Sequence, residues 1–233
     1  MLDHWANNYF HWVVYCLPKV AVLAGMGLCD TVLLPGVGGR SRFIEESLHL
    51  LGVDTSSAPR LERGVTALED LVVVHGGRFG PQLLQRLRER LTAGTRARVP
   101  ARRLFISRRR AQWRRLRDEG KLVALVSSLG FEIVEPEGLS FGEQVGLFSE
   151  ADLVVAPNGA GLANTVWCAA GTTVVALGAS SRTAPDFYRL CLAMGHRYWL
   201  VEGELEDDGR PEAHRDLVID PADLQRTLGH ILE

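Results

Sequence analysis

The stretch DLVVAPNGAGLANTVW (152–167) predicts a buried strand, a glycine turn at 158–161 and a helix. The first backbone N–H groups of a helix have no partner within it, and together with the helix dipole they favour an anion. Glycine lets the backbone come close to a phosphate. The turn could therefore hold a phosphate or diphosphate, although a tight turn that only packs against the sheet fits the same spacing. Neither the P-loop nor the dinucleotide-binding pattern is present.

Arg108 is the second candidate for this chemistry. It follows the predicted strand RRLFIS (102–107), so it lies at the carboxyl end of a strand. In a parallel sheet that end shares an edge with the turn at 158–161. The planar guanidinium offers a fork of donors suited to a diphosphate. We therefore expect Arg108 and the 158–164 segment, which contains the turn, to bind a diphosphate from two sides.

The other arginines of segment 96–121 have a simpler interpretation. A solvent-exposed helix face explains Arg114, Arg115 and Arg117. Nucleic-acid binding would require a basic surface with interleaved aromatic residues, and here only Trp113 interleaves. The net charge of the chain is −2, which gives no general attraction to nucleic acid. The acidic run EDD (206–208) is interpreted as solvated loop charge, and no histidine or cysteine cluster has zinc spacing.

Strands that alternate with helices position these residues. The predicted strands lie at 30–36, 68–77, 102–107, 131–136, 152–157, 172–177, 197–203 and 217–219. The predicted helices lie at 11–25, 41–53, 80–94, 113–130, 140–151, 162–170, 184–195 and 221–233. Such alternation predicts an α/β fold with parallel sheets. The glycine cluster GVGGRS (36–41) lacks the last glycine of the dinucleotide pattern and is predicted to be a loop.

Two Rossmann-like halves with a ligand cleft between them agree with this order. The polar segment GTRARVPA (94–101) is the predicted linker, which places an N-terminal half at 1–97 and a C-terminal domain at 98–233. The first half is shorter, and we expect it to be incomplete or truncated, or to be completed by a partner chain or by a second copy in a homo-oligomer.

The composition is that of a globular protein, with 233 residues, 46% hydrophobic and 23% charged. Four cysteines without a C-x-x-C pair indicate buried reduced thiols. No apolar run is long enough to span a bilayer, and no signal-peptide pattern opens the chain. We expect a cytoplasmic protein, with contact at the inner face of the membrane left open.

An ordered set of motifs carries a family resemblance. The set comprises NYFHW (8–12), LPK (17–19), FISRRRAQWRRLRDE (105–119), FEIVEPEGLSFGEQVGLFSEADLVVAPNGAGLAN (131–164) and GTTVVAL (171–177). Together these motifs resemble the family 61 glycosyltransferases, which include bacterial capsular-polysaccharide enzymes, plant xylan arabinosyl- and xylosyltransferases and animal O-linked N-acetylglucosaminyltransferases. Family members usually have His-Gly-Ala-Gly where this chain has Asn158, Asn-Glu where it has Asp118-Glu119, and often an acidic residue where it has Tyr15.

The resemblance implies a GT-B fold and a nucleotide-sugar donor bound mainly by the C-terminal half. It further implies inversion at the anomeric carbon, a glycan or glycolipid acceptor as in capsule or surface polysaccharide synthesis, no cofactor and no essential metal. An inverting transferase needs a base for the acceptor hydroxyl and a group that stabilises the departing diphosphate. His11 is the candidate base, since its ordinary pKa lies near neutrality, although a packed or capping histidine explains it equally well.

The remaining site residues follow from the same resemblance. Asn8 either caps the first helix or orients a sugar hydroxyl, and Tyr15 lies on the acceptor side. Glu143 and Gln144 contact the ribose or base, or Glu143 forms a capping box with Ser140. The expected leaving-group site consists of Arg108, Asn158, Gly159, Ala160, Gly161 and Asn164.

Two other functions stay open. One is a catalytically impaired module of the same fold that binds nucleotide sugar or a partner, given the departures at Asn158 and Tyr15. The other is an α/β-hydrolase, suggested by VVVHGG (72–77) and by Ser180 after a strand. Its nucleophile pattern fails because Arg182 occupies the second glycine position.

Overall fold

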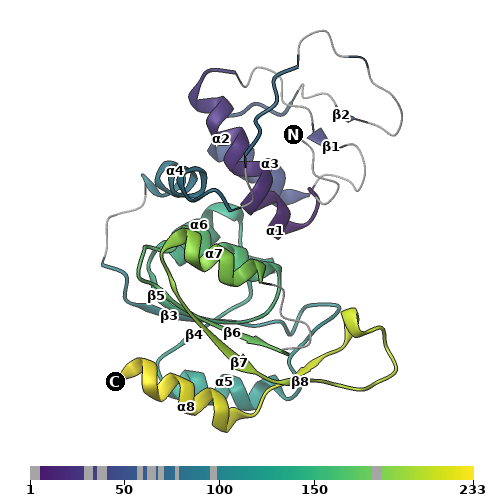
Figure 1. Cartoon of the computed structure of the whole chain (residues 1–233), viewed down its shortest axis with the longest axis vertical. Coiled ribbons are helices and arrows are strands. Elements are labelled where there is room, and N and C mark those ends of the chain that lie inside the picture. Colours follow the sequence, from purple (N-terminus) through teal and green to yellow (C-terminus); the bar gives the residue numbers. More distant parts are fainter. Residues whose placement is uncertain are drawn as a thin grey trace.

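A five-stranded parallel sheet forms the centre of the computed structural model (Figure 1). The strand order is β4-β3-β5-β6-β7. The strands are β3 (Arg102–Ile106), β4 (Glu132–Val134), β5 (Ala151–Pro157), β6 (Thr173–Gly178) and β7 (Arg197–Glu202). The structure describes residues 6–28, 34–35, 41–56, 60–61, 67, 71–76, 79–94, 99–179 and 185–233.

Helices cover both faces of this sheet, as an all-parallel sheet requires. One face packs on α5 (Glu119–Ser128) and α8 (Pro221–Leu232), and the other on α6 (Phe141–Ser149), the 3₁₀ helix η3 (Ala160–Trp167) and α7 (Asp186–Met194). Side chains of the central strands alternate between the two cores. On β5, for example, Leu153 and Val155 join the α5–α8 core, whereas Val154 and Ala156 join the other.

The N-terminal helices pack on the outer side of the α6, η3 and α7 layer (Figure 1). A continuous helical run contains α1 (Tyr9–His11), a π-helical turn η1 (Trp12–Cys16) and α2 (Leu17–Gly25), and it is followed by α3 (Arg42–Leu50) and α4 (Pro81–Thr92). Their buried side chains form one continuous core with that face of the sheet. The N-terminal helices are therefore held directly against the elements that follow the strands.

Short elements complete the described structure. Strands β1 (Leu34–Pro35) and β2 (Arg60–Leu61) pair in parallel, and β8 (Glu204–Leu205) and β9 (Leu217–Val218) pair in antiparallel. Two 3₁₀ turns, η2 (Pro136–Gly138) and η5 (Glu212–His214), follow β4 and β8 respectively. No helix in the described ranges is long and apolar enough to cross a membrane.

The α/β class and the parallel C-terminal sheet are confirmed, and three local predictions are wrong. Residues 71–76 form no strand and expose Leu71, Val72 and Val73, because no described strand lies beside them to pair with. The helix predicted at 113–130 begins only at Glu119, since residues 115–117 pair with the chain near Leu217 instead. The helix predicted after the glycine turn is the 3₁₀ helix η3.

Other sequence predictions are only partly covered by the described residues. Cys16, Cys168 and Cys191 are buried free thiols, as expected, and burial raises the pKa of Cys191 to about 12. Cys29, Ser180 and most of the glycine cluster at 36–41 lie outside the described residues. The domain boundary near residue 97 stays a prediction.

Candidate functional site

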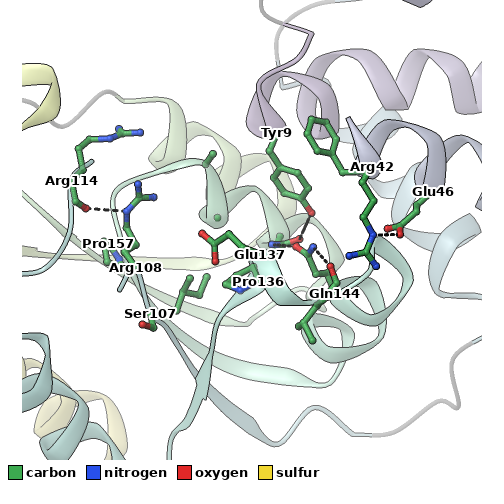
Figure 2. Close-up of a pocket in the computed structure, with 16 residues that line it drawn as sticks. Tyr9, Arg42, Glu46, Ser107, Arg108, Arg114, Pro136, Glu137, Gln144 and Pro157 are labelled. Carbon is green, nitrogen blue, oxygen red and sulfur yellow. Dashed lines mark hydrogen bonds and ion pairs between the residues drawn. The ribbon is translucent and has the colours of Figure 1, made fainter. Parts of the chain in front are cut away.

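A cavity of about 380 Å³ lies at the carboxyl edge of the sheet, beneath the N-terminal helices (Figure 2). Its volume falls in the range of small-molecule sites. The ends of β3, β4 and β5 supply one side, and α1 and α3 supply the other. In Figure 2, Arg108 and Arg114 lie at one end of the cavity, and Tyr9 and Arg42 lie at the opposite end.

Arg108 lies two residues after the end of β3 and lines this cavity, as the sequence predicts. Its Nε donates to the Arg114 carbonyl at 2.9 Å, and its Nη2 donates to the Trp113 carbonyl at 3.0 Å. Its backbone N–H donates to Glu119 Oε1 at 3.0 Å. Burial lowers the pKa of Arg108, while the carboxylates of Glu137, Glu119 and Asp216 oppose the shift. The guanidinium is therefore fixed in place and keeps its charge, with Nη1 outside these two hydrogen bonds.

Arg114, the acceptor for Arg108, has a left-handed backbone with φ of 58°. A residue with a side chain reaches this region at a cost of about 1–2 kcal/mol. Such strain persists only where surrounding contacts hold it, and it is frequent at functional sites. Here it turns the Arg114 carbonyl toward the Arg108 guanidinium.

The glycine turn meets Arg108, which confirms that the two share one edge. A Cβ atom on Gly159 would lie 2.7 Å from Arg108 Nη1, so a side chain at this position would force the guanidinium to shift. A Cβ on Gly161 would lie 3.4 Å from Ile106 Cγ2, which is an ordinary contact. Ala160 and Gly161 line the cavity. The backbone of this turn thus lies close to the Arg108 guanidinium and faces the same cavity.

Asn158 lies on the other side of the turn. Its backbone N–H donates to the Leu177 carbonyl at 2.7 Å, and its buried Oδ1 has no hydrogen-bond partner among the described residues. It lines a second cavity of about 200 Å³, which shares Arg114 and Pro157 with the first. A direct role for Asn158 in ligand binding stays a prediction.

Asn164 and Gln144 form a hydrogen-bonded group with Tyr9. Asn164 Oδ1 accepts from the Tyr9 hydroxyl at 2.6 Å and from Trp167 Nε1 at 3.1 Å, and Asn164 Nδ2 donates to Gln144 Oε1 at 2.9 Å. Burial raises the pKa of Tyr9 well above its ordinary value, so the phenol stays protonated. The group joins α1 to α6 and η3 along one wall of the cavity. Asn164 is completely buried, and its contacts explain it without a ligand.

Two carboxylates line the described cavity, Glu46 and Glu137. Glu46 accepts from Arg42 Nε at 2.6 Å and from the Phe141 backbone N–H at 2.6 Å, so both of its oxygens are occupied. Glu137 lies on η2 and is exposed, and no described residue forms a hydrogen bond or ion pair with its carboxylate. Figure 2 shows Glu137 between Arg108 and Gln144. It is the carboxylate that a ligand in this cavity can reach.

Other predicted site residues lie away from the cavity lining. Asn8 caps α1 by accepting from the backbone N–H groups of Phe10 (3.0 Å) and His11 (3.4 Å). The His11 ring stacks edge-on with Tyr15 at 5.3 Å. Glu143 and Ser140 form the predicted capping box, whose hydrogen bonds lower the pKa of Glu143. These contacts fit the structural alternatives, and the ligand-binding roles stay predictions.

Arg115 and Arg117 of the arginine-rich segment and Asp207 and Asp208 of the acidic loop are exposed, as the sequence indicates, and ion pairs form around them. Arg117 pairs with Glu206 at 3.5 Å, and Arg215 pairs with Asp207 at 3.2 Å. Asp216, which is buried, pairs with Arg210 at 3.0 Å. Within the described part of the chain, no three His, Cys, Asp or Glu side chains are placed to hold a metal ion.

Sequence reasoning did not assign several residues that line the cavity, namely Tyr9, Arg42, Glu46, Arg114 and Glu137. Glu137 follows a predicted strand, as Arg108 does, and this position at the carboxyl end of a strand is a sequence signal for it. Tyr9 and Arg42 come from helices whose packing against the sheet the sequence does not state. The left-handed backbone at Arg114 has no sequence signal, since glycine is the residue expected there.

Comparison with known proteins agrees with this geometry. The family model for glycosyltransferase 61 matches residues 9–175, a range that contains Tyr9, Arg108, Glu137 and the glycine turn. A search of curated proteins gave no match.

Proposed function

Since the chain belongs to the glycosyltransferase 61 family and is a glycosyltransferase, we propose that the cavity binds a nucleotide-sugar donor and transfers its sugar to a glycan or glycolipid acceptor. The proposal includes inversion at the anomeric carbon without a metal ion. The observation that carries it is the closeness of the Arg108 guanidinium to the glycine turn at the carboxyl edge of the sheet. A GT-B arrangement, in which segment 1–97 provides the acceptor side, and a role in capsule or surface polysaccharide synthesis belong to the same proposal.

Arg108 is the proposed stabiliser of the leaving group. Its charge is held in a partly buried place, where electrostatic interactions are stronger than in water. Nη1 lies beside Gly159, so an oxygen of the diphosphate can contact both the guanidinium and the backbone of the turn. When the bond from the anomeric carbon to the phosphate oxygen breaks, its electron pair stays on the diphosphate. Fixed positive charge then replaces the metal ion that other transferases use.

Glu137 is the proposed base within this cavity. His11, the candidate from the sequence, does not line the cavity, whereas the Glu137 carboxylate does. The acceptor hydroxyl gives its proton to Glu137 as its oxygen forms the new bond to the anomeric carbon. The proton thus ends on the Glu137 carboxylate and the electron pair of the broken bond ends on the diphosphate, so the transfer balances.

Calorimetry with a panel of nucleoside diphosphates and nucleotide sugars tests this proposal. Arg108→Ala should weaken binding roughly 10- to 100-fold, because a hydrogen bond to a charged group contributes about 1.5–3 kcal/mol. Arg109→Ala is the matched control, since Arg109 pairs with Glu135 at 3.2 Å outside the cavity. Equal affinities of the wild type and Arg108→Ala would contradict the assigned role.

Transfer assays then separate binding from chemistry. Glu137→Gln should keep donor affinity and lose most of the transfer rate, whereas Glu135→Gln, in the salt bridges to Arg109 and Arg110, should keep both. If Glu137→Gln keeps the full transfer rate and His11→Ala loses it, then His11 is the base. Donor binding by the wild type without transfer to any acceptor would favour the alternative of a binding module.

A further inference from the structure

We propose that Asp216 is a positioning residue that orients the Arg108 guanidinium through a single peptide plane. Asp216 lies in the loop before β9, far along the chain from β3, and no sequence motif points to it. Its side chain is buried and does not line the main cavity. Its effect on a ligand would therefore pass through another group.

The connecting group is the peptide between Arg114 and Arg115. The carbonyl of this peptide accepts from Arg108 Nε at 2.9 Å, and its N–H donates to Asp216 Oδ1 at 2.8 Å. A peptide is planar, so fixing its N–H also fixes the direction of its carbonyl. Hydrogen bonds in such a chain polarise one another, which strengthens the acceptor that faces Arg108.

The peptide would not keep this direction on its own. The left-handed φ of Arg114 opposes it, and the next backbone hydrogen bond along the segment is at the Arg115 carbonyl, to which Leu217 N–H donates at 2.9 Å. The Asp216 carboxylate accepts the N–H of the strained peptide itself. Asp216 is in turn fixed by Arg210, whose Nη2 lies 3.0 Å from Oδ2.

Charge supports the same role. Asp216 is one of three carboxylates that favour the charged form of Arg108 against the effect of burial. Desolvation acts to raise the pKa of Asp216, but hydrogen bonds from the Arg115 N–H and the Arg210 side chain outweigh it and keep the pKa below its ordinary value. Asp216 is thus a carboxylate at neutral pH, so its negative charge lies one peptide away from the Arg108 guanidinium.

A ligand-free experiment tests the positioning directly. The Nε–Hε signal of Arg108 is assigned by nuclear magnetic resonance from its loss in Arg108→Lys, and its exchange with water is measured. Asp216→Asn should speed this exchange at least about tenfold, because a hydrogen bond to a charged group gives protection of this order. Asp207→Asn is the control, since Asp207 lies in the same loop and pairs with Arg215 at 3.2 Å rather than with Arg210, Asp216 or the peptide. Unchanged Arg108 exchange in a folded Asp216→Asn would overturn the inference.

A binding experiment tests whether the positioning of Arg108 by Asp216 affects ligand binding. This experiment rests on the proposed function. Asp216→Asn should weaken nucleoside diphosphate binding roughly tenfold in the wild type and less than about twofold in an Arg108→Ala background. Equal losses in both backgrounds would mean that Asp216 acts apart from Arg108, which refutes positioning. If the wild type binds no nucleotide, the proposed function fails while the exchange result still decides the inference.

A measurement on the wild type tests the inference even if the Asp216→Asn variant does not fold. The Arg115 backbone amide should exchange slowly, because its N–H is bound to a buried carboxylate. Rapid exchange of this amide in the folded wild type would also overturn the inference.

Discussion

Gly159→Ala is the sharpest perturbation of the candidate site. The added Cβ would lie 2.7 Å from Arg108 Nη1, whereas non-bonded heavy atoms settle at about 3.5 Å or more. The guanidinium must therefore retreat by roughly 0.8 Å. Gly159 itself has an extended backbone with φ of 178°, which alanine adopts without strain. The change thus acts on Arg108 and leaves the turn intact.

The expected magnitude follows from the hydrogen bonds of Arg108. Its bonds to the Arg114 and Trp113 carbonyls are 2.9 and 3.0 Å long, and a shift of this size takes at least one of them beyond the usual limit of about 3.2 Å. The loss of one charge-assisted contact to the donor costs about 1.5–3 kcal/mol, or roughly 10- to 100-fold in affinity. The free energy of unfolding should change by less than about 1 kcal/mol, since alanine restricts the unfolded chain and offsets the shift.

Titration calorimetry with a nucleoside diphosphate and urea unfolding measure the two quantities. Gly161→Ala is the control from the same turn, because its Cβ would meet Ile106 Cγ2 at an acceptable 3.4 Å. Its affinity should stay within about threefold of the wild type. The reasoning is refuted if Gly159→Ala binds as tightly as Gly161→Ala, or if Gly159→Ala weakens binding only by unfolding the protein.

Two further predictions concern stability. In urea unfolding, the free energy of unfolding of Arg114→Ala should be about 1 kcal/mol lower than that of Arg114→Gly, because the backbone at this position is left-handed. This order is the reverse of the usual one for alanine and glycine. Equal stability of the two variants would mean that the backbone is relaxed there. Burial lowers the pKa of His196 below 6.5, so the unfolded chain binds a proton that the folded chain does not, and the free energy of unfolding should fall as the pH drops below about 6.5 toward the folded-state pKa. His196→Gln should reduce this pH dependence of the free energy of unfolding. If the pH dependence is the same in His196→Gln as in the wild type, other groups cause it.

The alternation of strands and helices, together with one topological rule, was enough to locate half of the site. Parallel strands end at one edge, so a residue after β3 and a turn after β5 had to meet there. Arg108 and Gly159 do meet, although 51 positions separate them in the sequence. Periodicity also placed the helices of the C-terminal half, with two exceptions. Residues 113–118 have the apolar and basic pattern of a helix face but form no helix, and the segment after the glycine turn is a 3₁₀ helix.

The other half of the site was decided by tertiary structure. Tyr9 and Arg42 reach the cavity because the N-terminal helices pack on α6 and η3. That packing depends on a shared apolar core, and many other arrangements of the same helices would also bury their apolar side chains. The direction of Arg108 depends on the strained peptide at Arg114 and on Asp216, which is 101 positions from Arg115. Local propensities carry no information on a strained backbone or on so distant a hydrogen bond, because both exist only once the whole sheet and its loops have folded together.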